Sequence, residues 1–250
     1  MPSTLSNAPP AVSAALDRLK DELTRAAGEN LVALVVYGGL ARGRYRPGKS
    51  DVNVAIVLRD AGAGALKVIA PALRIARRSV AVVPLILTAA ELPSTALVFP
   101  TKLLDIKNHH IVLAGEDPFS ALDVPRAQMS WRIVQELRNI TLRLRQRFVA
   151  AVDDKDAQTA ALAGIARPLA IQFQALLQLA GKPVPADDRS ATIFQATAAA
   201  FGVDGETLAM LAALRQGESV STDLPTLFGR VLTILESLTQ EAERHKETPA

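Results

Sequence analysis

The sequence contains no cysteine, few aromatic residues (4%) and no marked excess of either charge. The absence of cysteine excludes disulfide bonds, thiolate metal ligands and a thiol nucleophile, so any metal must be held by oxygen or imidazole. The 28 Lys and Arg against 25 Asp and Glu leave a net charge of only +3, and we therefore expect no nucleic-acid partner. A hydrophobic content of 49% in 250 residues excludes disorder and is sufficient for one large or two modest cores.

Long apolar runs are also missing. The longest, LVALVVY at residues 31–37, is far too short to span a bilayer. The first residues, MPSTLSNAPPAV, lack the basic and apolar regions of a secretion signal. We therefore expect a cytoplasmic protein without a membrane partner.

Hydrophobic periodicity predicts that the first half of the chain mixes helices and strands. The predicted elements are a helix at 11–27, strands at 31–37 and 51–58, a helix at 63–78 interrupted at Pro71, and a strand at 80–87. Pro84 indicates that the last of these is an edge strand or carries a bulge. Two apolar runs, 99–106 and 111–113, flank a polar tip that is either a hairpin or a helix-to-strand turn. We expect His109 and His110 in this tip to be solvated.

From Pro125 onward the strand-like runs disappear and helical periodicity dominates. Helices are predicted near 126–152, 155–180, 190–200, 205–216 and 223–246. Trp131 is expected on the buried side of the first of them. The segment GEDPFSALDVP at 115–125, with two prolines, is the expected boundary between domains at 1–118 and 125–250.

The segment VYGGLARGRYRPGKSDVNV at 36–54 carries most of the functional information. One interpretation is a P-loop, because residues 43–50 satisfy G-x-x-x-x-G-K-[ST] and Lys49 would then reach the terminal phosphates. The context disagrees, since five residues separate Tyr37 from Gly43 and a strand pattern follows Ser50. A P-loop NTPase therefore remains an alternative, although the segments before and after the motif do not fit a P-loop.

The same segment suits phosphate binding in another way. Asp51 and Asn53, two residues apart on a strand, share a face with Cα atoms about 6–7 Å apart, so their oxygens can hold a divalent ion jointly. Four cations lie within eight residues, and no acid occurs between Asn30 and Ser50. Gly38 and Gly39 end the preceding strand and would let the backbone approach a phosphate closely.

This pattern resembles the nucleotidyltransferase superfamily, the DNA polymerase β-like group that includes aminoglycoside and minimal nucleotidyltransferases. Those proteins have an apolar strand, Gly-Gly or Gly-Ser, roughly nine to thirteen residues, and then Asp-x-Asp or Asp-x-Glu; here eleven residues, Leu40 to Ser50, separate Gly39 from Asp51. The stretches ARG (41–43) and SD (50–51), and the run FP…LDI…LAGED between 99 and 117, are similar to other stretches of many bacterial members. The resemblance covers about residues 30 to 120.

The resemblance implies an α/β (α+β) nucleotidyltransferase-like domain with a mixed sheet, followed by an α-helical bundle. It also implies transfer of a nucleoside monophosphate from an NTP to a hydroxyl of a small molecule or protein, with Mg²⁺ as cofactor. Asp51 and Asn53 would be the catalytic metal ligands. The remaining nucleotide-binding positions would be Gly38, Gly39, Arg42, Lys49 and Ser50.

Three departures from the family pattern predict impaired catalysis. Asn53 replaces an acid and removes one negative charge from the site that binds Mg²⁺. No Asp or Glu occurs between Asp60 and Glu91, where the family's third acid, which acts as the base, would lie. Gly39 replaces a frequent phosphate-binding Ser. The rival interpretation is therefore a pseudoenzyme, a nucleotide-sensing or protein-binding module on the same fold.

Overall fold

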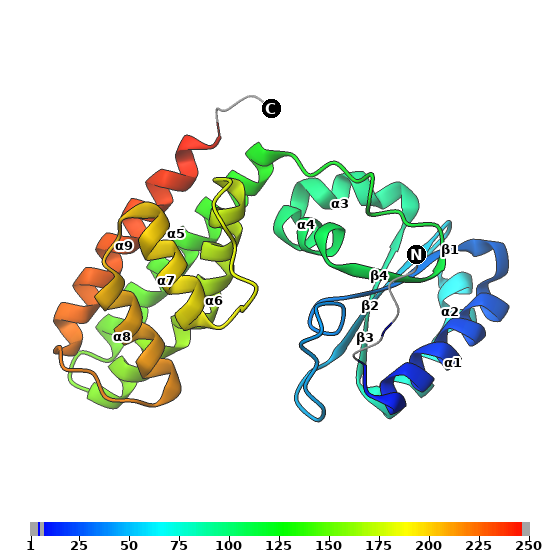
Figure 1. Ribbon diagram of the computed structural model, residues 1–250, viewed down its shortest axis with the longest axis horizontal. Coiled ribbons are helices and arrows are strands. Elements are labelled where there is room, and N and C mark those ends of the chain that lie inside the picture. The colour runs from blue at the N-terminus through cyan, green and yellow to red at the C-terminus, as the bar shows by residue number, and fades with distance from the viewer. Residues whose placement is uncertain (1–4, 6–7, 247–250) are drawn as a thin grey trace. The chain divides into compact units, whose positions relative to one another are not determined.

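The computed structural model describes residue 5 and residues 8–246, and the chain divides into two compact units, with the boundary in the sequence between Val124 and Pro125 (Figure 1). The N-terminal unit contains a four-stranded sheet flanked by helices. Its elements are α1 (Pro10–Ala27), η1 (Gly28–Asn30), β1 (Leu31–Tyr37), β2 (Val52–Leu58), α2 (Ala63–Val80), β3 (Val82–Thr88), η2 (Ala89–Glu91), α3 (Leu92–Val98), α4 (Pro100–Asn108) and β4 (His110–Gly115).

The sheet is mixed, as the resemblance implied. Its strand order is β3-β2-β1-β4; β1 pairs antiparallel with both β2 and β4, whereas β2 and β3 are parallel. β3 therefore lies at an edge, where Pro84 can be accommodated because its missing N–H costs no interior hydrogen bond.

Alternation of side chains along β1 and β2 builds a separate core on each face of the sheet. Val36 and Val54 point to the face covered by α1 and α2, together with Leu16 and Leu19 of α1. On the other face, the core residues of β1 and β2 pack with those of α3, α4 and the following segment: Ala33, Val35, Tyr37, Ala55, Val57, Leu92, Ala96, Leu103, Ile106 and Phe119. Figure 1 shows the two pairs of helices on opposite sides of the sheet.

One feature of this unit contradicts the sequence-based expectation, and another decides between two alternatives that the sequence left open. The predicted interruption of the second helix is wrong, because α2 continues through Pro71. Pro71 is exposed, and the burial of Ile69, Ala72 and Ala76 keeps both halves of the helix against the sheet. The undecided tip is a helix-to-strand turn, with α4 ending at Asn108 and β4 beginning at His110.

The C-terminal unit is a bundle of helices, each of which buries apolar side chains. Its elements are α5 (Arg126–Ala150), α6 (Lys155–Leu179), α7 (Ser190–Phe201), α8 (Gly205–Gln216) and α9 (Leu224–Arg244). Asp154, Asp204 and Asp223 cap the N-termini of α6, α8 and α9 by accepting hydrogen bonds from backbone amides. These caps explain why each helix begins where it does.

Two side-chain placements in the bundle need comment. Trp131 on α5 is 57% exposed, with the Lys246 ammonium 3.8 Å from the ring centroid, so the expectation of a buried Trp131 is wrong. α6 is the one helix of the described part of the chain that is long and apolar enough to cross a membrane. Its apolar side chains pack against α5, α7 and α8, as expected of the central helix of a bundle.

Candidate functional site

The candidate site lies at the end of the sheet where β1 ends and β2 and β4 begin. Tyr37, the last residue of β1, pairs with Asn53 on one side and with His110 on the other. Paired residues on neighbouring strands project from the same face, so Asn53, Tyr37 and His110 form one row across the sheet. Asp51, two residues before Asn53, extends the same face and is exposed. The strand pairing thus fixes the face of Asn53, and Asp51 stands directly before the first paired residue of β2.

The loop from Gly38 to Arg44 is a compact turn that begins directly after β1. Gly38 has φ +72°, and a Cβ atom there would lie 3.0 Å from Nδ2 of Asn53, so glycine provides both the backbone conformation and the space for the Asn53 amide. Backbone N–H groups of Arg42 and Arg44 donate to the carbonyls of Gly38 (3.2 Å) and Gly39 (2.7 Å). The turn thus places Gly38 beside Asn53.

Lys49 and Ser50 belong to a second turn nearer β2. Gly48 in this turn has φ +73°, and Lys49 is exposed. The Ser50 hydroxyl accepts a hydrogen bond from the backbone N–H of Arg46 at 3.1 Å, and the Ser50 amide donates to the Arg46 carbonyl at 2.9 Å. Ser50 therefore closes the turn, and the strand β2 follows it directly. A P-loop needs a helix at that point, so the chain trace does not support the P-loop alternative.

Arg42 connects the loop to α4. Its guanidinium forms an ion pair with Asp105 on α4, and its side chain is only 13% exposed. Nδ1 of His109 lies 3.7 Å from the same Asp105 carboxylate. Burial and, next, the positive charges of Arg42 and Arg44 lower the pKa of His109 below its ordinary value, which favours the neutral imidazole.

His110 is not solvated as expected, because its side chain is only 10% exposed. Its Nδ1 lies 2.7 Å from the Ile106 carbonyl, its Nε2 lies 3.0 Å from Asp117, and its ring packs on Phe119. Burial alone would raise the pKa of Asp117, but hydrogen bonds from the Phe119 amide and from His110 outweigh it, and the net pKa is lowered. His110 thereby anchors the end of α4, the start of β4 and the segment after β4.

The metal-binding capacity of this end of the sheet is small. Asp51 and Asn53 offer one carboxylate and one amide oxygen, which suit a hard cation in type but carry half the charge of a carboxylate pair. In the described residues, no three His, Asp or Glu side chains converge as a metal site. β3 supplies no acid, and the residue opposite Asn53 on β3 is Val83. Asp51 and Asn53 alone would therefore hold a Mg²⁺ ion only weakly.

Sequence reasoning assigned no role to Asp105, His110 or Asp117. Asp105 and Asp117 lie in the stretches that resemble LDI and GED, and Asp105 and His109 are four residues apart, as needed to meet on one helix face. Asp105 and Arg42 are sixty-three residues apart in the sequence, so no local pattern predicts their contact.

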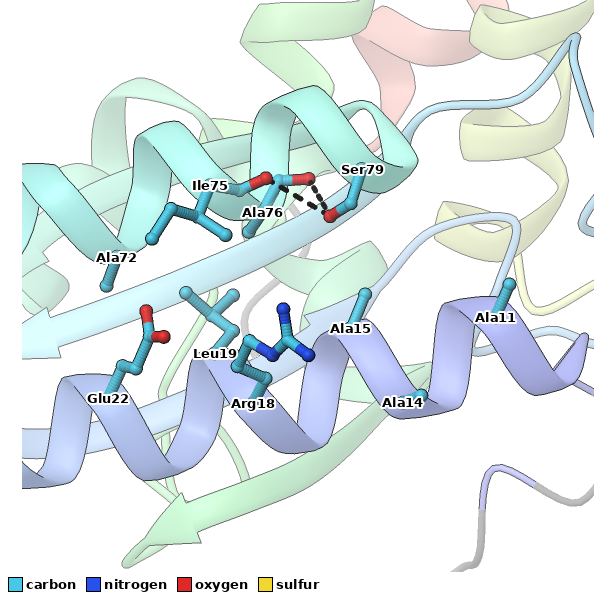
Figure 2. Close-up of a pocket in the computed structure, with 10 residues that line it drawn as sticks. All are labelled: Ala11, Ala14, Ala15, Arg18, Leu19, Glu22, Ala72, Ile75, Ala76 and Ser79. Carbon is cyan, nitrogen blue, oxygen red and sulfur yellow. Dashed lines mark hydrogen bonds between the residues drawn. The ribbon is translucent and has the colours of Figure 1, made fainter.

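The two clearest cavities lie elsewhere. A groove of about 210 Å³ between α1 and α2 is lined mainly by alanines, with Arg18 and Glu22 beside it, and the Ser79 hydroxyl donates to helix carbonyls there (Figure 2). It lies on the face of the sheet opposite Asn53. The second, about 300 Å³, is in the helical unit beside Gly202 and Arg230. Neither contains any of the residues that the sequence singled out.

Comparisons with known proteins bear on the fold. No protein-family model matches the sequence, and no curated protein matches it significantly. A solved structure, spectinomycin adenyltransferase AAD(9) from Enterococcus faecialis with ATP and spectinomycin, superposes with a TM-score of 0.51 at 13% identity, over 90% of this chain and 98% of that one. This chain has the nucleotidyltransferase fold. The superposition extends over both units, so the helical bundle is part of the likeness.

Proposed function

We propose that this chain binds a nucleoside triphosphate at the β1–β2 loop and transfers the nucleoside monophosphate to a hydroxyl of a small molecule or protein, with impaired catalysis. The observation that carries the proposal is the placement of Asp51 and Asn53 on one face, beside the Gly38 turn. In the nucleotidyltransferase fold that position serves the triphosphate and its metal. The neighbour AAD(9) holds ATP and spectinomycin, which supports an NTP and a small hydroxyl-bearing acceptor for this chain.

Backbone amides add support. No hydrogen bond within the described residues uses the N–H groups of Gly39, Leu40 or Ala41, and consecutive amides in a turn form a concavity suited to phosphate oxygens. Arg42 and Lys49 stand on either side of Arg44 and Arg46, which makes the loop strongly cationic. We propose that this turn holds the phosphates and that Arg42 and Lys49 contact them.

Asp51 and Asn53 would hold Mg²⁺. The ion, when bound, would neutralise the phosphates and stabilise charge on the leaving pyrophosphate. Asp51 contributes the one carboxylate, and the Asn53 oxygen contributes a dipole without charge. The lost charge is the physical basis for expecting slow transfer. We also propose a cytoplasmic location, in accord with the lack of cysteine.

Calorimetric titration of ATP, GTP, CTP and UTP, with and without Mg²⁺, tests the binding step. We expect Mg²⁺-dependent binding of at least one nucleotide, a loss of at least tenfold in Asp51→Ala, and a gain in Asn53→Asp. Asp21→Ala removes an equally exposed carboxylate from α1, on the other face of the sheet, and serves as the matched control. Equal binding by wild type and Asp51→Ala would rule out this site.

Pyrophosphate release tests the transfer step, with spectinomycin as the first acceptor and other polyhydroxylated compounds as further ones. Asn53→Asp should release pyrophosphate faster than wild type, because the second carboxylate restores charge beside the metal. If nucleotide binding needs no metal, and neither wild type nor Asn53→Asp releases pyrophosphate, the protein would instead be a nucleotide sensor. The amide at residue 53 and the absence of an acid on β3 favour that second candidate.

A further inference from the structure

His109 lies at the same end of the sheet as Asn53. It joins α4 to β4 and directly precedes His110, the partner of Tyr37 across from Asn53. Two interstrand spacings separate the backbones of His110 and Asn53, roughly 10 Å. A nucleotide phosphate held beside Asn53 and an acceptor hydroxyl beside β4 can therefore lie in contact.

The surroundings of His109 form an ordered chain of contacts. The Arg42 guanidinium holds the Asp105 carboxylate, and that carboxylate faces Nδ1 of His109 at 3.7 Å. A base oriented by a third group, which is itself fixed, is the usual arrangement for an activated base. The imidazole is half exposed, so Nε2 remains within reach of a substrate hydroxyl.

The charges that face His109 keep it ready to accept a proton. Arg42 and Arg44 of the loop are the positive groups, and Asp105 of α4 is the negative one. The neighbouring His110 is turned to Asp117. With burial, the two arginines lower the pKa of His109, so the neutral form predominates at pH 7.

We propose that His109 is the proton acceptor for the acceptor hydroxyl, in place of the carboxylate missing from β3, and that Asp105 positions it; this rests on the proposed function. The hydroxyl oxygen forms a bond to the α-phosphorus as its proton moves to Nε2 of His109. The bond between the α-phosphorus and the bridging oxygen of pyrophosphate breaks, and pyrophosphate leaves with that electron pair. Asp105 stabilises the imidazolium until the proton passes to solvent.

The test uses the full chain in the Asn53→Asp background, where transfer is expected to be fastest. His109→Gln, Asp105→Asn and the exposed neighbour Asn108→Gln as control are compared by MgATP titration and by pyrophosphate release with spectinomycin and the other acceptors, between pH 5 and 9. We expect unchanged ATP affinity in His109→Gln and Asn108→Gln, a loss of release of about 100-fold in His109→Gln and about tenfold in Asp105→Asn, and no change of release in Asn108→Gln.

Two further readouts separate catalysis from structure. The release rate of the parent should rise with pH through a midpoint below about 6.5, the ordinary His value, and His109→Gln should lack this rise. Added imidazole should restore pyrophosphate release by the His109→Ala variant. Release within twofold of the parent in His109→Gln, or loss of its ATP binding, would overturn the role of His109 alone. Absence of release from wild type and Asn53→Asp would overturn the proposed transfer, and the role of His109 with it.

Discussion

Gly115, the last residue of β4, determines how closely this strand approaches β1. Its φ is +78°, and a Cβ atom there would lie 1.9 Å from the Val32 carbonyl oxygen, far inside contact distance. The obstacle is backbone, which no side-chain rotation can move aside. The same carbonyl accepts a hydrogen bond from the Glu116 amide at 3.2 Å, which the displaced strand would lose.

Gly115→Ala should therefore destabilise the N-terminal unit by about 4 kcal/mol. Positive φ costs an alanine roughly 1–2 kcal/mol, forced displacement of packed atoms about 1–3, and the hydrogen bond about 1. Gly48→Ala is the matched control, because Gly48 has φ +73° but nothing within 4 Å of the added Cβ. It should cost only the first of these contributions, about 1 kcal/mol.

Urea unfolding of both variants, followed by far-UV circular dichroism and hydrogen exchange of β1 and β4, measures the difference. The fluorescence of Trp131, the sole tryptophan, reports on the helical unit and should be the less affected signal. If Gly115→Ala and Gly48→Ala differ by less than about 0.5 kcal/mol, the close approach of β4 to β1 is wrong. Since β4 carries His110 and follows His109, such a result would also weaken the description of the candidate site.

Other perturbations test the anchoring contacts and the caps. His110→Ala removes both polar contacts of the buried ring and leaves the Asp117 carboxylate without its imidazole partner, so the free energy of unfolding of the N-terminal unit in urea should fall by about 2 kcal/mol. Asp204, the cap of α8, has its pKa lowered by hydrogen bonds from the Thr207 hydroxyl and amide. Its folded pKa lies below the unfolded value, so the stability that it contributes is present above about pH 4 and lost as pH falls through the folded pKa. Asp204→Asn keeps the capping oxygen but not the charge, so its urea midpoint should be lower than that of wild type at pH 7 and should fall less than that of wild type between pH 4 and 2.

The elements that sequence alone predicted well are those whose burial is local and periodic. β1 is an unbroken apolar run, β2 alternates and α1 has a helical apolar stripe, and the structure confirms all three within one residue at either end. Pro84 indicated an edge strand because proline has no N–H to donate, whereas an interior strand needs its N–H groups for hydrogen bonds to both neighbours. β3 is at the edge of the sheet. The interruption predicted at Pro71 was wrong, because packing on one face can hold a helix together across a proline that faces solvent.

The candidate site was only half visible from the sequence. Asp51 and Asn53 are two residues apart, so their common face follows from strand geometry alone. The contacts of Asp105 and His110 depend on how α4 folds back on the sheet, and this packing is set by residues far away in the chain. Trp131 was misplaced for a related reason. It lies about 60° around α5 from Val134, at the margin of an apolar stripe whose exact width tertiary packing decides.

The balance of charge around the β1–β2 loop links these observations to function. Residues 38–53 contain four cations and one acid, Asp51, whereas a second carboxylate at residue 53 would offset one more of them. In the proposed function, a triphosphate, which carries three to four negative charges at neutral pH, would be held by these cations as well as by its Mg²⁺. Mg²⁺, by contrast, gains little from a site with a single carboxylate. The replacement of an acid by Asn53 therefore favours holding the nucleotide over activating it, and a neutral base such as His109 suits this site better than another carboxylate beside the phosphates.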